Sequence, residues 1–93
     1  MQESGASRPP SPERRLFGRI LAQARASRRL SQEALAFEAD YHPKYISQLE
    51  RGINSPSLTA LLRLGKALGV PASELVRRVE EALQKKPKSA RPK

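Results

Sequence analysis

The chain has 93 residues, a formal net charge of +9 and no cysteine, which suits one small domain without a disulfide framework or a thiolate metal site and favours a polyanionic partner. No apolar run approaches the roughly 18 residues of a membrane-spanning helix, and the polar, proline-rich N-terminus is unlike a signal peptide. We therefore expect a cytoplasmic protein without a membrane segment.

Both ends of the chain have the composition of tails. Residues 1–10 contain Gly, Ser and two prolines with almost no apolar content, which predicts disorder. Residues 13–76 hold ten basic and six acidic side chains, whereas residues 77–93 hold seven and two. Residues 85–93 are predicted to form a basic, disordered tail that either aids solubility or binds phosphates without reading sequence. The folded domain is predicted over residues 11–84.

A first helix is predicted to begin at Pro12, with Ser11 as its N-cap, and to end near Ser27 or Arg28. Its apolar residues recur at helical spacing and predict one broad buried face. That face comprises Leu16, Phe17, Ile20, Leu21 and Ala24. The other side of the helix carries arginines at positions 14, 15, 19 and 28.

Residues 31–52 contain two short predicted helices, separated by the turn Asp40-Tyr41-His42. Ser31 caps the first of them, whose apolar face is formed by Leu35, Ala36 and Ala39. Pro43 fits the first position of the second helix and Gly52 fits its end. Two such helices joined by a tight turn form a helix-turn-helix, which lays its second helix in the DNA major groove. This segment therefore predicts DNA binding.

Two further helices follow a predicted loop at residues 53–56. Ser57 caps the fourth helix, which ends before Gly69 and has the predicted core residues Leu58, Leu61, Leu62, Leu64 and Leu68. Gly65 lies on its buried side and costs up to about 1 kcal/mol of helix propensity, which a close approach between helices would explain. A fifth helix runs from Pro71 to about Lys85. Its apolar stripe either packs back on the first helix or forms a dimer interface, with Leu75, Val76, Val79 and Leu83 as candidates.

A series of short motifs runs in order through residues 12–76. These are Phe17-Gly18, Arg25, Leu30-Ser31-Gln32, Leu35-Ala36, Tyr45-Ile46-Ser47, Leu49-Glu50-Arg51-Gly52, Pro56-Ser57-Leu58 and Leu68-Gly69-Val70. The series resembles the Cro/C1-type (xenobiotic-response-element-like) helix-turn-helix repressors. The resemblance implies an all-α, five-helix, lambda-repressor-like domain, with the helix-turn-helix at the second and third helices. Asp40 replaces the usual Gly of the turn, and since Asp tolerates a left-handed backbone better than most residues, the turn is still expected. His42 replaces the usual Ser or Thr before the second motif helix and is expected to take the cap position.

Sequence readout requires donors and acceptors on the exposed side of the second motif helix. Its predicted interior residues are Ile46 and Leu49. The outward candidates for base contact, on which position and resemblance agree, are Pro43, Lys44, Ser47 and Gln48. A glutamine can pair with adenine and a lysine can donate to guanine or to a phosphate, whereas Pro43 offers only shape and apolar contact. The alternative for each polar residue is a solvated side chain.

Phosphate contacts are expected around this helix. Gln32 lies at the N-terminus of the first motif helix, where backbone N–H groups favour an anion. The resemblance implies the same role for Gln32 and backbone contacts for Tyr45, Arg51 and Asn54. It also implies a partly buried ion pair between Arg25 and Glu50, with an acidic base reader as the alternative for Glu50.

The predicted function is that of a sequence-specific DNA-binding transcriptional regulator, a repressor that acts as a homodimer on double-stranded DNA with a two-fold site. One histidine, no cysteine and no glycine-rich phosphate loop argue against an enzyme, a metal site or a cofactor. Two alternatives remain open. The first is an antitoxin-like module whose 76–83 stripe binds a partner protein, and the second is a non-specific nucleic-acid chaperone that depends on the basic tail.

Overall fold

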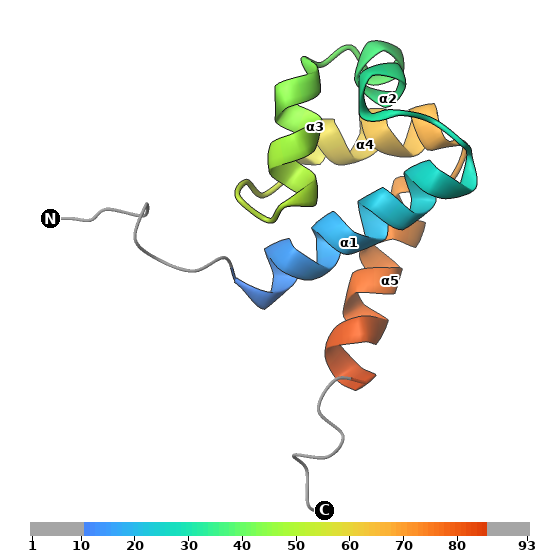
Figure 1. Cartoon of the computed structure of the whole chain (residues 1–93). Helices are drawn as coiled ribbons and strands as arrows, with labels where there is room; N and C mark the ends of the chain where they lie inside the picture. Colours follow the sequence, from blue (N-terminus) through green and yellow to red (C-terminus); the bar gives the residue numbers. More distant parts are fainter. Residues whose placement is uncertain (1–10, 86–93) are drawn as a thin grey trace, which may run out of the picture.

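The computed structural model describes residues 11–85. They form five helices and no strand, namely α1 (Pro12–Ser27), α2 (Gln32–Ala39), α3 (Pro43–Glu50), α4 (Leu58–Leu68) and α5 (Ala72–Lys85) (Figure 1). The predicted all-α, five-helix class is confirmed. None of these five helices is long and apolar enough to cross a bilayer. Residues 1–10 and 86–93, which fall in the predicted tails, lie outside the described residues, whereas Lys85 is the last residue of α5.

Polar side chains begin four of the helices. The hydroxyl oxygens of Ser11, Ser31 and Ser57 accept from a backbone N–H three residues later, at 3.2, 2.9 and 3.0 Å respectively. At α3, Nδ1 of His42 accepts from the backbone N–H of Lys44 at 3.0 Å. Each contact satisfies one of the N–H groups that a helix leaves unpaired in its first turn. The caps that the sequence predicts at Ser11, Ser31, His42 and Ser57 are confirmed.

The turn between α2 and α3 depends on Asp40, whose φ is 64°. Aspartate tolerates this left-handed conformation better than most residues. The backbone N–H of Tyr41 donates to the carbonyl of Ala36 at 2.8 Å and so closes the end of α2. The tight turn therefore forms without the glycine that the family commonly has there.

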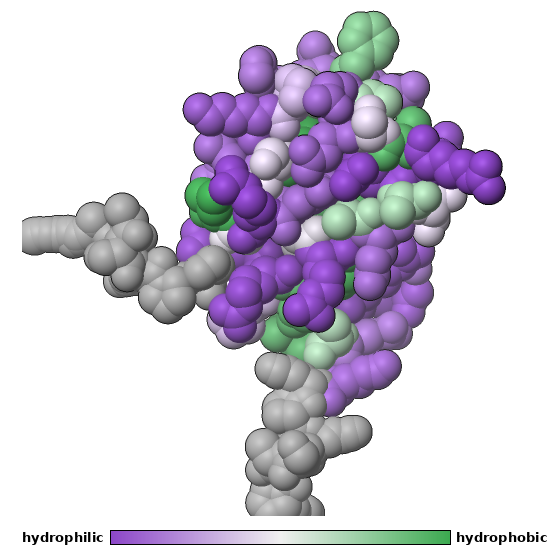
Figure 2. Space-filling model, in the orientation of Figure 1, coloured by the Kyte–Doolittle hydropathy of each residue, from purple (hydrophilic) through white to green (hydrophobic). Residues whose placement is uncertain are grey.

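One hydrophobic core joins all five helices. Its seven largest fully buried side chains are Leu21, Leu35, Ile46, Leu49, Leu64, Leu68 and Leu75. The helix α1 contacts α3 and α5, while α2 contacts α3 and α4 (Figure 1). In this arrangement α3 is held by α1 and α2 together, and its remaining side faces solvent. Hydrophilic residues dominate the face of the molecule seen in Figure 2, where hydrophobic areas are small and separate.

The core of α4 differs from its prediction at two positions. Leu58 is 72% exposed and Leu62 is 57% exposed, so their assignment to the core is wrong. Small residues are buried instead, at Ala60, Gly65 and Ala67. Five leucines cover more than one side of an 11-residue helix, and periodicity alone does not select the buried side. An added Cβ at Gly65 would lie 2.8 Å from the carbonyl oxygen of Val70, so the expected close approach occurs there, against the segment that leads into α5.

The apolar stripe of α5 mainly packs within its own chain. Leu75 is fully buried, so this predicted candidate for a dimer interface is instead a core residue. Val79 is half-buried and packs against the core, and Leu83 is also half-buried. Only Val76 remains well exposed among the four candidates, at 42%. The reason is the extensive contact between α5 and α1, which covers the stripe.

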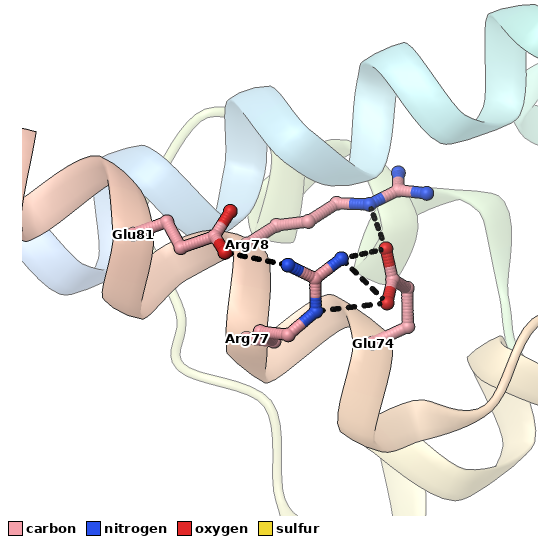
Figure 3. A network of polar contacts seen from close by, with 4 residues as sticks. All are labelled: Glu74, Arg77, Arg78 and Glu81. Atoms are coloured by element: carbon pink, nitrogen blue, oxygen red, sulfur yellow. Dashed lines mark hydrogen bonds and ion pairs between the residues drawn. The ribbon is translucent and has the colours of Figure 1, made fainter.

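A small ion-pair network lies on the solvent side of α5. The guanidinium of Arg77 lies between the carboxylates of Glu74, at 2.7 Å, and Glu81, at 2.5 Å, while Arg78 donates to Glu74 at 2.9 Å (Figure 3). Hydrogen bonds from Arg77 and Arg78 lower the pKa of the Glu74 carboxyl. Because that pKa is depressed, the stabilisation is present above the unfolded-state pKa and is lost as the pH falls through the folded-state value. Solvent screens pairs of this kind, so they add little to the stability of the fold.

We predict that Gly18→Ala destabilises the domain. An added Cβ would lie 2.5 Å from the carbonyl oxygen of Leu49 and 2.8 Å from the carbonyl carbon of Glu50, both backbone atoms at the end of α3. Relief would require a shift of one helix, and we expect the free energy of unfolding to fall by about 1–3 kcal/mol. Urea denaturation followed by circular dichroism measures this change. Helix propensity alone predicts a gain of up to about 1 kcal/mol, so a more stable variant would contradict the backbone contact.

Candidate nucleic-acid interface

The outward side of α3 carries the four residues predicted to contact bases. Ile46 and Leu49 are fully buried on its inner side. Lys44 is exposed, while the other three candidates, Pro43, Ser47 and Gln48, are half-buried at the surface. The structure therefore brings the candidates together on one helix, with two polar groups and one cation facing solvent, and their contact with bases remains a prediction.

An ion pair joins α1 to the end of α3. Arg25 donates to the carboxylate of Glu50 through Nε at 2.6 Å and through Nη2 at 3.0 Å. Its Nη1 donates to the carbonyl of Leu30, just before α2, at 2.9 Å. The side chains are 20% and 8% exposed respectively. Hydrogen bonding to Glu50 raises the pKa of Arg25, so the guanidinium stays charged. This bidentate geometry fixes the orientation of α3 as well as its position.

Gln32 also belongs to this network. Its Nε2 donates to Oε1 of Glu50 at 2.9 Å, which ties the first turn of α2 to the same carboxylate. An amide nitrogen carries two N–H donors, so the second can serve a phosphate, the role that the sequence predicts. Neither periodicity nor the resemblance predicted the contact with Glu50, which depends on how α2 and α3 pack together.

Asn54 contacts another predicted DNA-binding residue. Its Nδ2 donates to Oε1 of Gln48 at 2.8 Å, so the loop after α3 orients the glutamine amide. The loop is itself held by Arg14, whose Nη1 donates to the carbonyl of Ile53 at 3.2 Å. Sequence reasoning assigned Asn54 to the DNA backbone and missed this contact. No periodic signal could reveal it, because it depends on the path of an irregular loop.

The two remaining candidates for phosphate contact lie in different surroundings. The ring of Tyr45 packs against that of Tyr41, with centroids 4.8 Å apart, and both contact the core. Burial raises the pKa of Tyr45, so its hydroxyl stays neutral. Arg51 is exposed at the C-terminal end of α3.

Within residues 11–85 no group of three or more His, Cys, Asp or Glu side chains could hold a metal ion.

Comparisons with known proteins agree with this architecture. Residues 21–75, from the middle of α1 to the start of α5, match the helix-turn-helix family HTH_3. The chain belongs to this family and is of the Cro/C1 type. It is 47% identical to control protein C.BamHI of Bacillus amyloliquefaciens over 64 residues, which cover 68% of this chain and 79% of that protein.

Solved structures of other helix-turn-helix regulators share the fold. The restriction-modification controller protein C.AhdI from Aeromonas hydrophila superposes with a TM-score of 0.68 at 35% identity, over 70% of this chain and 98% of that protein. The clp gene regulator ClgR from Corynebacterium glutamicum superposes with a TM-score of 0.75 at 28% identity, over 87% and 88%. This helix-turn-helix protein is accordingly a DNA-binding transcriptional regulator, and its relatives are regulatory proteins rather than enzymes.

We predict that Arg25→Ala lowers the free energy of unfolding by about 3 kcal/mol, because it leaves a nearly buried carboxylate with fewer partners. The double variant Arg25→Met with Glu50→Leu should be clearly more stable than Arg25→Ala, since it leaves no buried charge. Thermal and urea denaturation compare the two. Equal losses in both variants would mean that packing of the arginine stem, rather than its charge, accounts for the effect.

Proposed function

We propose that this protein is a sequence-specific repressor that binds a two-fold operator as a homodimer and reads each half-site with α3. The observation that carries the proposal is the outward face of α3, where Lys44, Ser47 and Gln48 lie together on a helix fixed by the Arg25–Glu50 pair. One such helix reads only a few base pairs, so two copies are needed for specificity. Their half-sites would lie about 34 Å apart, one turn of DNA.

The proposed readout divides the residues by chemistry. Gln48, oriented by Asn54, would pair with an adenine, and Lys44 would donate to a guanine. Ser47 and Pro43 would complete the surface against the bases. Gln32, Tyr45 and Arg51 would contact phosphates, which position α3 without reading sequence. In this scheme Asn54 acts mainly by holding Gln48, although its predicted contact with the DNA backbone remains open to test.

We propose a dimer interface on α4 and α5 that keeps only Val76 of the stripe predicted from the sequence. Leu58 and Leu62 are exposed one turn apart on α4. The exposed Val76 of α5 lines a hollow of about 190 Å³ together with Leu61 of α4. Exposed apolar side chains favour association, and a two-fold dimer buries the same surface on both copies. Leu58, Leu62 and Val76 are the residues proposed for this interface.

The names of two relatives support a proposal about the class of target genes. C.AhdI is named as a restriction-modification controller protein, and C.BamHI is named as a control protein. We therefore propose that the operator lies in a promoter that serves restriction–modification genes. The observation in favour is the 35% identity to C.AhdI, whose chain is covered to 98%.

We predict that Gln48→Ala and Arg51→Ala weaken DNA binding in different ways. Binding is measured by fluorescence anisotropy, on a duplex that the wild-type protein selects from a random library and on an unselected duplex. Gln48→Ala should weaken the selected duplex by about 1–3 kcal/mol and the unselected one little. Arg51→Ala should weaken both and reduce the salt slope by about one unit.

A matched control for these variants is Lys66→Ala, which removes an exposed cation from α4. It should leave both affinities nearly unchanged. Equal losses for the selected and unselected duplexes in Gln48→Ala would show that α3 does not read bases with this residue.

We predict that Leu62→Glu with Val76→Glu gives a folded monomer that binds a half-site but shows no cooperativity on a two-fold site. Both side chains are exposed, so the charges can be solvated in the monomer. Sedimentation equilibrium and circular dichroism test this outcome. Leu75→Glu serves as the contrast and should lose helicity, because it places a carboxylate in the core. A dimer that persists in the double variant would place the interface elsewhere.

A further inference from the structure

A hollow of about 490 Å³ lies between α1 and the helix-turn-helix, beside the outward face of α3. Its floor includes Gly18 and Ala22 of α1. Because both residues are small, this side of α1 does not fill the space beside α3. Gly18 is required there because the backbone at the end of α3 leaves no room for a Cβ. The same constraint that brings α1 against α3 therefore creates a depression between them.

The rim of the hollow is rich in donors and cations. Arg15 and Arg19 of α1 line it on one side, and Gln32, Ser47 and Arg51 line it on the other. Three guanidinium groups, one amide and one hydroxyl thus surround a space large enough for a phosphate group with its adjoining sugar. Guanidinium groups bind phosphate oxygens particularly well, because their N–H groups match the geometry of the anion.

The one acidic residue in the lining does not oppose an anion strongly. Glu50 accepts two hydrogen bonds from Arg25 and one from Gln32. Its charge is therefore offset by a cation at close range. The arginines of the rim thus leave an excess of positive charge over this hollow. The ligand that matches such a site is an anion with several oxygen acceptors.

The position of the hollow identifies which anion. Its lining includes Ser47, a proposed base contact, and both Gln32 and Arg51, proposed phosphate contacts. A strand of DNA that passes along α3 would run over this site. We infer that the hollow binds a phosphodiester of the operator and that Arg19 of α1 is a DNA contact. No motif in the sequence assigns this role to Arg19, and the inference rests on the proposed readout by α3.

The Arg19 guanidinium is suited to this contact. It is exposed, and within residues 11–85 it makes no hydrogen bond or ion pair that would have to break on binding. A phosphate held between α1 and α3 would fix the distance of α3 from one DNA strand, which sets the register of its side chains on the bases. α1 would then be the third helix of the domain to contact DNA.

The test measures the affinity of Arg19→Ala for the selected duplex over a range of salt concentrations. Loss of one phosphate contact should lower the affinity about five-fold near 0.15 M salt and reduce the slope of log affinity against log salt by about one unit. Sequence preference should be nearly unchanged. Arg19→Lys keeps the charge and should keep the slope, and Lys66→Ala is the control for an equal loss of charge on another surface.

Neutral methylphosphonate substitutions, placed one at a time in the selected duplex, then locate the contact. One substitution should weaken the wild-type protein but have little further effect on Arg19→Ala. An unchanged salt slope in Arg19→Ala, with normal sequence-specific binding by the wild type, would overturn the inference and leave the proposed function intact. Absence of sequence preference in the wild-type protein would overturn the proposed function, and this inference with it.

Discussion

The position of α3 depends on the guanidinium of Arg25, which reaches from α1 to the end of α3. Two of its nitrogens donate to Glu50 and a third donates to the carbonyl of Leu30, so one side chain connects α1, the start of the helix-turn-helix and its second helix. Gln32 donates to the same carboxylate. Because Glu50 is only 8% exposed, other orientations of α3 would leave its charge without partners in a poorly solvated site.

The helix α1 contacts α3 in two ways, through an ion pair and through a close backbone approach. At Arg25 the helix holds α3 through charge, and at Gly18 it contacts the backbone of α3 directly. The first contact sets orientation and the second sets distance. Both contacts also affect the surface that DNA would meet. The ion pair offsets the negative charge of Glu50, and Gly18, which has no side chain, leaves the hollow between α1 and α3 unfilled. The two contacts that hold α3 against α1 therefore also determine the charge and the shape of the surface beside α3.

Local chemistry made much of this fold predictable from the sequence. The serine caps, the left-handed Asp40 and the helix limits depend on neighbouring residues. The caps and the turn occur as expected, and α5 begins one residue later than predicted, at Ala72. Features that depend on distant elements were not predictable in this way. Leu58 and Leu75 show the difference, since periodicity identified apolar positions but could not tell which of them another helix would cover. The residues of the site followed from position and resemblance, whereas the contact between Asn54 and Gln48 needed the path of the loop.

The pairing of the first helix with the last has a consequence for synthesis. Because α1 packs against α5, the core of a growing chain stays incomplete until Leu75 has left the ribosome. Residues 31–52, which carry the helix-turn-helix, emerge well before that point. The Arg25–Glu50 pair can therefore form before the core is closed, and the domain completes its packing only once α5 has emerged. Any premature stop before α5 would yield a fragment with an exposed core, suited to degradation rather than to occupying a promoter.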